Sequence, residues 1–136
     1  MATSGSSGVS VTSHNSLWFN WKVKEPSIAG NYTVISWEIR LTADYYGAIN
    51  SSALKSWNAT INGKYYEGTN YVNIGAYGDK LLASGETKID HNADGSKQFS
   101  FSFNQYFGIT FSGAWVGTIS GNGSAWLESI PRKATF

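Results

Sequence analysis

The sequence predicts an all-β fold: an antiparallel β-sandwich of roughly seven or eight strands, immunoglobulin-like, fibronectin-like or jelly-roll-like in arrangement. Apolar and polar residues alternate with a period of two over most of the chain. Clusters of Gly, Asn, Asp and Ser recur about every 8–12 residues, and no stretch has the period of an amphipathic helix. The 136 residues contain no cysteine and suffice for one domain with its own core.

The N-terminal segment differs in composition from the rest of the chain. Residues 1–8 read MATSGSSG, which predicts a flexible arm before a single sandwich domain over residues 9–136. The segment has neither the basic end nor the apolar run of a signal peptide. No stretch approaches the ~18 consecutive apolar residues of a membrane helix, so we expect no membrane insertion.

Two strands are predicted in the first third of the chain, over residues 17–24 and 31–42, because every second side chain is apolar. Pro26 is expected to end the first strand, because proline has no N–H for a β-ladder. Residues 43–56 are predicted to form a loop or one short helical turn. The side chains expected to face the core are Leu17, Phe19, Trp21, Val23, Ile35, Trp37, Ile39 and Leu41.

Asn62-Gly63 is the strongest turn signal, because both central positions of a type I′ hairpin need positive φ. Farther on, Phe99, Phe101 and Phe103 alternate with polar residues and indicate one buried strand face. The strands predicted after the central loop span residues 56–61, 64–67, 70–74, 81–89, 98–107, 109–118 and 124–130. Turns are predicted at 75–79, at Gly121-Asn122-Gly123, and as a hairpin tip at 90–95.

Charge is sparse and balanced. The net charge is +1, and charged residues make up 14% of the chain, against roughly 25% in typical soluble domains. The lysines are scattered singly, so the sequence contains no basic patch of the kind that displaces counterions from phosphates. We therefore expect no nucleic-acid partner.

Asp90-His91-Asn92-Ala93-Asp94-Gly95 spells D-x-N-x-D-G, the first half of a calcium-binding loop. Asp90, Asn92 and Asp94 would be the metal ligands, but Phe101 stands where the loop needs a bidentate Glu. The pattern favours a β-turn in which Asn92 and Asp94 bind backbone N–H groups and Gly95 takes positive φ. We predict no metal and no cofactor.

Catalytic patterns are missing from the sequence. There is no G-x-S-x-G nucleophile elbow, no cysteine nucleophile, and no pair of carboxylates that stands out among the nine acidic residues. We therefore predict that the protein is not an enzyme. A wall-degrading enzyme is the alternative that the composition fits worst.

Aromatic residues make up 15% of the chain, more than a core needs. Those predicted to fill the core are Phe19, Trp21, Trp37, Trp57, Phe99, Phe101, Phe103 and Phe111. Adjacent tyrosines on an extended segment point to opposite faces, so one of each adjacent pair should be exposed. Exposed Tyr and Trp rings suit sugar rings or a protein partner, although some of them could simply cover strand faces. The candidate ligand-binding residues are Tyr45, Tyr46, Tyr65, Tyr66, Tyr71, Tyr77 and Trp115.

Three stretches of the sequence resemble motifs of a known family. They are PSIAGNYTVISWEI over residues 26–39, IDHNADGSK over 89–97, and GNGSAWLESIPR over 121–132. In this order they resemble an uncharacterised tail or baseplate protein family of long-tailed phages (siphoviruses), with its HNADGSK and IPR motifs. The family's proteins usually carry further domains after the IPR strand. This chain ends soon after it, at Phe136, which suggests an excised domain or a short member.

The resemblance implies a structural virion protein of a phage with a Gram-positive host, built as an immunoglobulin-like or fibronectin-like sandwich. With the aromatic surplus, it leads us to expect a tail or baseplate module that attaches to the host surface by binding a cell-wall carbohydrate. Many copies on one particle would add avidity. The alternative is a purely structural tail component, whose aromatic surface contacts other tail proteins or further copies of itself.

Overall fold

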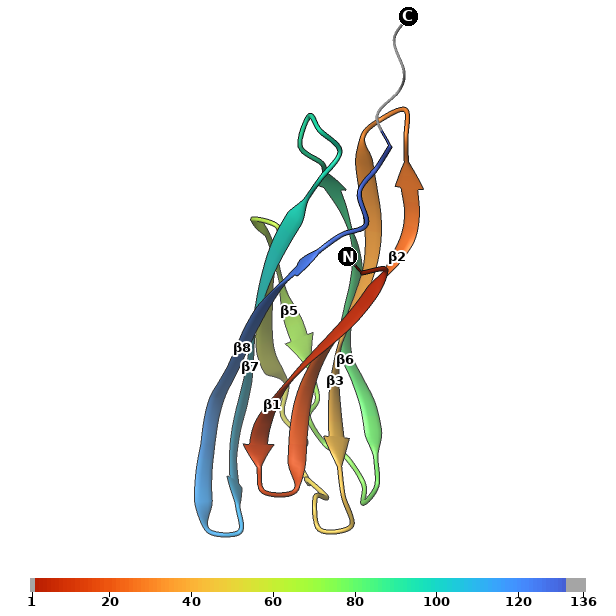
Figure 1. The fold of residues 1–136 in the computed structure, drawn as a ribbon. Helices are drawn as coiled ribbons and strands as arrows, with labels where there is room; N and C mark the ends of the chain where they lie inside the picture. Colours follow the sequence, from red (N-terminus) through yellow and green to blue (C-terminus); the bar gives the residue numbers. More distant parts are fainter. Residues whose placement is uncertain (1, 132–136) are drawn as a thin grey trace, which may run out of the picture.

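The computed structural model describes residues 2–131 and contains eight antiparallel strands in two packed sheets (Figure 1). The described part of the chain has no helix, and so none long and apolar enough to cross a membrane. The all-β sandwich predicted from the sequence is therefore confirmed. The strands are β1 (Ser4–Thr12), β2 (Asn15–Ser27), β3 (Tyr32–Ala43), β4 (Lys55–Ile61), β5 (Lys64–Asn70), β6 (Asp79–Asp90), β7 (Gln98–Phe111) and β8 (Ala114–Trp126).

One sheet has the strand order β1-β2-β3-β6, and the other has the order β5-β4-β7-β8. From β2 onward, this order is that of strands A-B-E and C′-C-F-G in immunoglobulin-type sandwiches. β1 is an additional strand at the edge of the first sheet. The chain crosses between the sheets in residues 44–54, 71–78 and 91–97, which therefore form loops at the ends of the sandwich.

The core lies between the sheets and is built mainly from aromatic side chains. Phe19 of β2 stacks on Phe101 of β7, with ring centroids 4.3 Å apart. Trp21 meets Phe99 edge to face at 5.0 Å, which is the arrangement that the charge distribution of two aromatic rings favours. The period-two prediction for the core is confirmed, except that Val23, Trp57 and Phe111 are only partly buried.

Residues 4–8 correct the expectation of a flexible arm, because they form the first half of β1 and pair with β2. Gly5 lies opposite Trp21, and Gly8 lies opposite Trp18. A Cβ atom at Gly5 would stand only 2.5 Å from Nε1 of Trp21, so the indole fills the space that a side chain would need. Residues 4–8 have the Gly/Ser composition of a linker but form an edge strand, because glycine lets the backbone lie against a large ring. Met1 of the predicted arm lies outside the described residues.

Pro26 does not end its strand, contrary to expectation. β2 continues to Ser27, and Pro26 pairs with Thr33 of β3 beyond a bulge after Val23. The register of β1 with β2 stops at Lys22, so within residues 2–131 one edge of β2 is open at Pro26. A missing N–H breaks no ladder hydrogen bond at an open edge.

The turns are partly those predicted. Asn62 and Gly63 form the expected type I′ turn, with φ of 50° and 81°. The turn expected at 121–123 is wrong, because these residues continue β8, with Gly121 opposite Phe103. The last hairpin instead turns at Ser112-Gly113, with φ of 47° and 81°. Gly121 is therefore a strand residue that lies opposite an aromatic ring.

Two further segments differ from prediction. Residues 90–95 do not form a hairpin tip, because β6 and β7 belong to different sheets. Residues 70–74 do not form a strand, although Val72 is buried and Ile74 makes an isolated bridge to Ile49. Apart from Asn70 at the end of β5 and Asp90 at the end of β6, both segments belong to the crossings between sheets.

Candidate functional site

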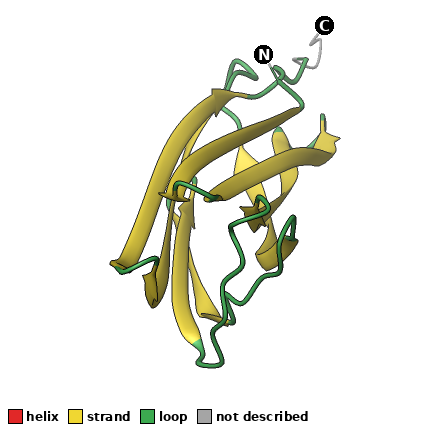
Figure 2. Cartoon of the chain, turned by 90° about the horizontal axis from the view of Figure 1, so that it is seen from below, coloured by secondary structure: helices red, strands yellow, loops and turns green. Residues whose placement is uncertain are grey.

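Three tyrosines form an exposed cluster at one end of the sandwich. The side chains of Tyr45, Tyr46 and Tyr77 are 60%, 69% and 74% exposed. The Tyr45 ring lies 4.9 Å from the Tyr46 ring and 5.9 Å from the Tyr77 ring, between centroids. We call these three residues, with His14 beside them, the tyrosine tip. Their segments lie at the lower end in Figure 1, which Figure 2 views from below.

Asp44 holds the two tyrosine-bearing turns together. Its Oδ1 accepts a hydrogen bond from the backbone N–H of Tyr46 (2.8 Å), and its backbone carbonyl accepts from the N–H groups of Gly47 (3.2 Å) and Tyr77 (3.0 Å). Tyr77 itself has a φ of 58°, so its turn holds a left-handed backbone. One aspartate therefore sets the relative position of all three tyrosines.

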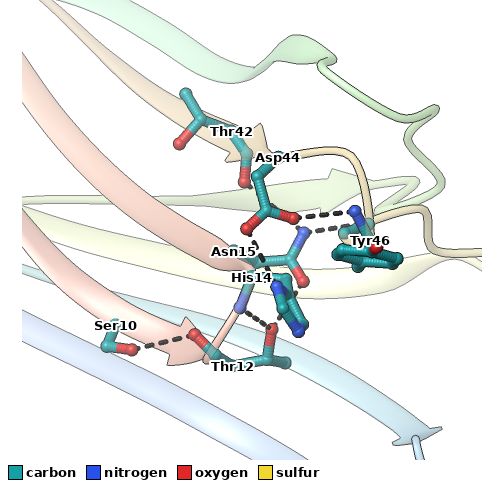
Figure 3. A network of polar contacts seen from close by, with 8 residues as sticks. Ser10, Thr12, His14, Asn15, Thr42, Asp44 and Tyr46 are labelled. Atoms are coloured by element: carbon teal, nitrogen blue, oxygen red, sulfur yellow. Dashed lines mark hydrogen bonds and ion pairs between the residues drawn. The ribbon is translucent and has the colours of Figure 1, made fainter.

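His14, in the turn between β1 and β2, contacts the same aspartate (Figure 3). Its Nδ1–H donates to Oδ2 of Asp44 at 2.8 Å, and its backbone carbonyl accepts from the Asp44 N–H at 3.0 Å. The hydrogen bond from His14, followed by that from the Tyr46 N–H, lowers the pKa of Asp44 below its ordinary value. The His14 ring also lies 5.4 Å from the Tyr46 ring, between centroids.

Asn15, at the start of β2, anchors the tip to the sandwich. Its side chain is buried, and its Nδ2 donates to the Gly47 carbonyl at 2.7 Å. The Thr12 hydroxyl donates to the Asn15 Oδ1 at 2.7 Å and accepts from the His14 N–H at 3.0 Å (Figure 3). Gly47 is required here, because a Cβ atom would stand 2.5 Å from the His14 carbonyl oxygen. The tip is thus held in place by hydrogen bonds to the sandwich.

A pocket of about 590 Å³ lies beside the turn that carries Tyr77. Residues from the loop 48–50, the turn around Gly75 and the start of β6 line it. Asn50, Asp79 and Lys80 contribute polar groups, and Nζ of Lys80 donates to Oδ1 of Asn73 at 2.8 Å. The tip therefore combines flat aromatic faces with a neighbouring set of hydrogen-bonding groups.

The other predicted ligand-binding residues do not join these ring contacts. Tyr65 is exposed beside the β4–β5 turn, Tyr71 is exposed just after β5, and Trp115 is 65% exposed near the start of β8. Tyr66 is partly buried: its ring lies 5.2 Å from Trp37, and its hydroxyl is 2.8 Å from Oγ1 of Thr87. Tyr66 is therefore a packing residue. The expectation that only one of Tyr45 and Tyr46 is exposed is wrong, because they lie in a turn.

The segment 90–95 is a turn organised by its own side chains. Oδ1 of Asp94 accepts from the N–H and the hydroxyl of Ser96, at 2.9 and 2.6 Å, and Gly95 has a φ of 88°. His91 is buried, with Nδ1 donating to the Gly95 carbonyl at 2.7 Å. The turn predicted for Asp94 and Gly95 is confirmed, whereas Asn92 donates to the Ser96 hydroxyl instead of accepting from the backbone. The described residues include no group of three or more His, Asp or Glu side chains placed to hold a metal ion.

The three stretches that carry the family resemblance meet at the end opposite the tyrosine tip (Figure 1). The backbone carbonyl of Asn31 accepts from the His91 N–H at 2.9 Å, and the Thr33 hydroxyl is 2.7 Å from Nε2 of His91. The Ile130 N–H donates to the Gly95 carbonyl at 3.0 Å. These contacts give the stretches a structural role. Arg132, the last residue of the third stretch, lies outside the described residues.

Sequence patterns missed the residues that build the tip: His14, Asp44 and Asn15. His14 and Asp44 are far apart in the chain, so no spacing links them. Asp44 did carry a local signal, because aspartate often accepts from the N–H two residues later, as it does here from Tyr46. No family model matches the chain, and neither a curated protein nor a solved structure does.

Proposed function

We propose that this domain is a non-catalytic binding module of a phage tail or baseplate, and that it attaches the virion to its host by binding a cell-wall carbohydrate at the tyrosine tip. The observation that carries the proposal is the exposure of Tyr45, Tyr46 and Tyr77 on turns that Asp44 fixes. A cluster of exposed aromatic rings is typical of an interaction site. Here three of them are held together.

The chemistry of the tip suits a sugar. A sugar ring presents an apolar C–H face that stacks on an aromatic ring, while its hydroxyl groups need hydrogen-bond partners. Tyrosine loses little conformational entropy on binding, because it has only two χ angles. Asn50, Asp79 and Lys80 in the adjacent pocket supply donors and acceptors for the hydroxyls.

The placement of the tip also fits attachment. The segments that resemble the phage tail family lie at the other end of the sandwich, where they hold the fold together. The hydrogen bonds that position the tip therefore do not involve the residues of those segments. Repetition of the module on one particle would convert weak binding per copy into firm adsorption.

A structural tail component is the second candidate, and β8 favours it. β8 is the edge strand of its sheet and carries Trp115 and Trp126, which are 65% and 51% exposed. Large rings along an edge strand suit contacts with another tail subunit. In that case the rings would be buried on assembly.

A pull-down of the purified domain on Gram-positive cell walls, with and without calcium, together with its mass in solution, tests the proposal. Binding by a monomer is expected, independent of calcium. A stable oligomer that does not bind any of the walls would favour the structural role. Binding that depends on calcium would restore the turn with Asp90, Asn92 and Asp94 as a metal site.

A further inference from the structure

A groove of about 810 Å³ runs over the outer face of the β1-β2-β3-β6 sheet, away from the core. We call it the outer groove. Its lining includes Gly5 and Gly85, the core residues Trp21 and Trp37, and small or polar residues, among them Asn20, Lys22, Ser36, Glu38, Ser84 and Glu86. No aromatic ring of the tyrosine tip takes part in it.

Strand register explains why the face is hollow. Ser4, Lys22, Ser36 and Glu86 lie side by side across the four strands, and Ser6, Asn20, Glu38 and Ser84 form the next row. Most of these side chains are short. The following row holds the larger Trp18, Arg40 and Leu81, which border the groove on the side of the tip.

The second of these rows is already organised by hydrogen bonds. Ser6 donates to Oδ1 of Asn20, and Nδ2 of Asn20 donates to Oε1 of Glu38 at 3.3 Å. Both carboxylates of the groove have a cationic partner within the protein, Glu38 in Arg40 at 2.9 Å and Glu86 in Lys24 at 2.9 Å, and Arg40 also binds Asp79. These partners reduce the repulsion that the acidic side chains would exert on an anion.

Several groups in the groove remain available to a ligand. Within residues 2–131, the groove side chains that make no hydrogen bond or ion pair are Ser4, Lys22, Ser36 and Ser84. Lys22 and Ser36 are adjacent across β2 and β3, and Ser84 lies in the neighbouring row. One unpaired cation next to free hydroxyls matches an anionic group carried on a hydroxyl-rich chain.

We propose that the outer groove is a second binding site, which takes a hydroxyl-rich chain bearing acidic groups, with one acidic group on Lys22 and the chain hydroxyls on Ser36 and Ser84. A uronic-acid polysaccharide and a polyol-phosphate polymer share this chemistry. The site is separate from the tyrosine tip and stands whether or not the tip binds sugar.

Arg40 links the groove to the pocket beside the tip. Arg40 binds Glu38 in the groove through Nε at 2.9 Å, and it binds Asp79 in the pocket beside the tip at 3.1 Å. Asp79 pairs with Thr42, so its backbone lies four positions along β3 from that of Glu38, or about 13 Å at the rise of a strand, and the Arg40 side chain bridges the two carboxylates. A polymer of a few units can therefore reach both sites.

Nuclear magnetic resonance titration of the full chain tests the groove with three probes: tetragalacturonate, a glycerol-phosphate oligomer and neutral maltotetraose. We expect at least one acidic probe to shift the amide signals of Asn20, Ser36 and Ser84, and maltotetraose to leave them in place. Which acidic probe binds tells whether carboxylate or phosphate is preferred. Absence of shifts at these amides with both acidic probes would overturn the proposal, as would equal binding of maltotetraose.

Variants identify the groups responsible. Lys22→Gln removes the charge while keeping a polar side chain, and it should weaken binding of the acidic probe about tenfold or more. Ser36→Trp should abolish it by filling the groove from an outward-facing position. Lys97→Gln, which removes a charge away from the groove, should bind like the wild type. Equal weakening by Lys97→Gln, or unchanged binding by Lys22→Gln, would contradict a site centred on Lys22.

Discussion

Gly85 of β6 lies directly opposite Trp37 of β3, and the indole covers the place where a side chain at Gly85 would begin. A Cβ atom there would stand 2.6 Å from Cζ2 of Trp37. The same relationship recurs in both sheets, so many glycines of this chain serve as strand partners of large rings. The further pairs are Gly5–Trp21, Gly8–Trp18, Gly68–Trp57, Gly121–Phe103 and Gly123–Phe101.

Gly85→Ala should therefore destabilise the domain. The new methyl group has to displace the Trp37 indole, and such overpacking costs about 1–3 kcal/mol in the free energy of unfolding. Urea unfolding followed by tryptophan fluorescence measures it. Gly75→Ala is the matched control, because nothing lies within 4 Å of its Cβ position. Equal stability of the two variants would contradict the glycine–indole contact.

Asn15→Ala should loosen the tyrosine tip. The change leaves the carbonyl of Gly47 without its buried donor, which costs about 1–3 kcal/mol. Faster amide hydrogen exchange at Gly47 and Tyr77 is the specific sign. Asn122→Ala, at an exposed position of β8, should stay within about 0.5 kcal/mol of the wild type. Unchanged exchange at Gly47 in Asn15→Ala would show that Asn15 does not anchor the tip.

His14→Ala should raise the pKa of Asp44 toward its ordinary value of 3.8, because the hydrogen bond from His14 is the main cause of its lowering. A lowered pKa in the folded state means that the carboxylate stabilises the fold above pH 3.8, and that this contribution is lost as the pH falls through the folded-state value. The stability difference between variant and wild type should therefore shrink below about pH 4. A carboxyl-carbon titration by nuclear magnetic resonance measures the Asp44 pKa directly. An unchanged pKa would refute the role of His14.

The core was predictable from the sequence because alternation along a strand reports directly on which face is buried. Phe19, Trp37 and Phe103 lie inward as expected. The glycine signals were ambiguous, because glycine serves both turns and strands that face large rings. Gly63 takes the first role with a φ of 81°, whereas Gly121 takes the second, opposite Phe103. Only the pairing of strands distinguishes the two roles.

The tyrosine tip could be predicted only in part. Tyr45, Tyr46 and Tyr77 stood out as aromatics without an inward position, but their sequence spacing does not bring Tyr77 to the other two. That contact depends on the Asp44 carbonyl, which accepts from the Tyr77 N–H across two inter-sheet crossings. The outer groove was not visible at all, because it arises from the register of four strands.

Binding of purified Gram-positive cell walls by the variant Tyr46→Ala/Tyr77→Ala is the most direct test of the central claim. Tyr65→Ala serves as the control, because Tyr65 is also an exposed tyrosine but lies outside the tip. Both variants should unfold at the same urea concentration as the wild type, since none of these rings is buried. The account predicts that the tip variant loses wall binding and that Tyr65→Ala retains it. Retained binding by the tip variant would contradict attachment through the tyrosine tip.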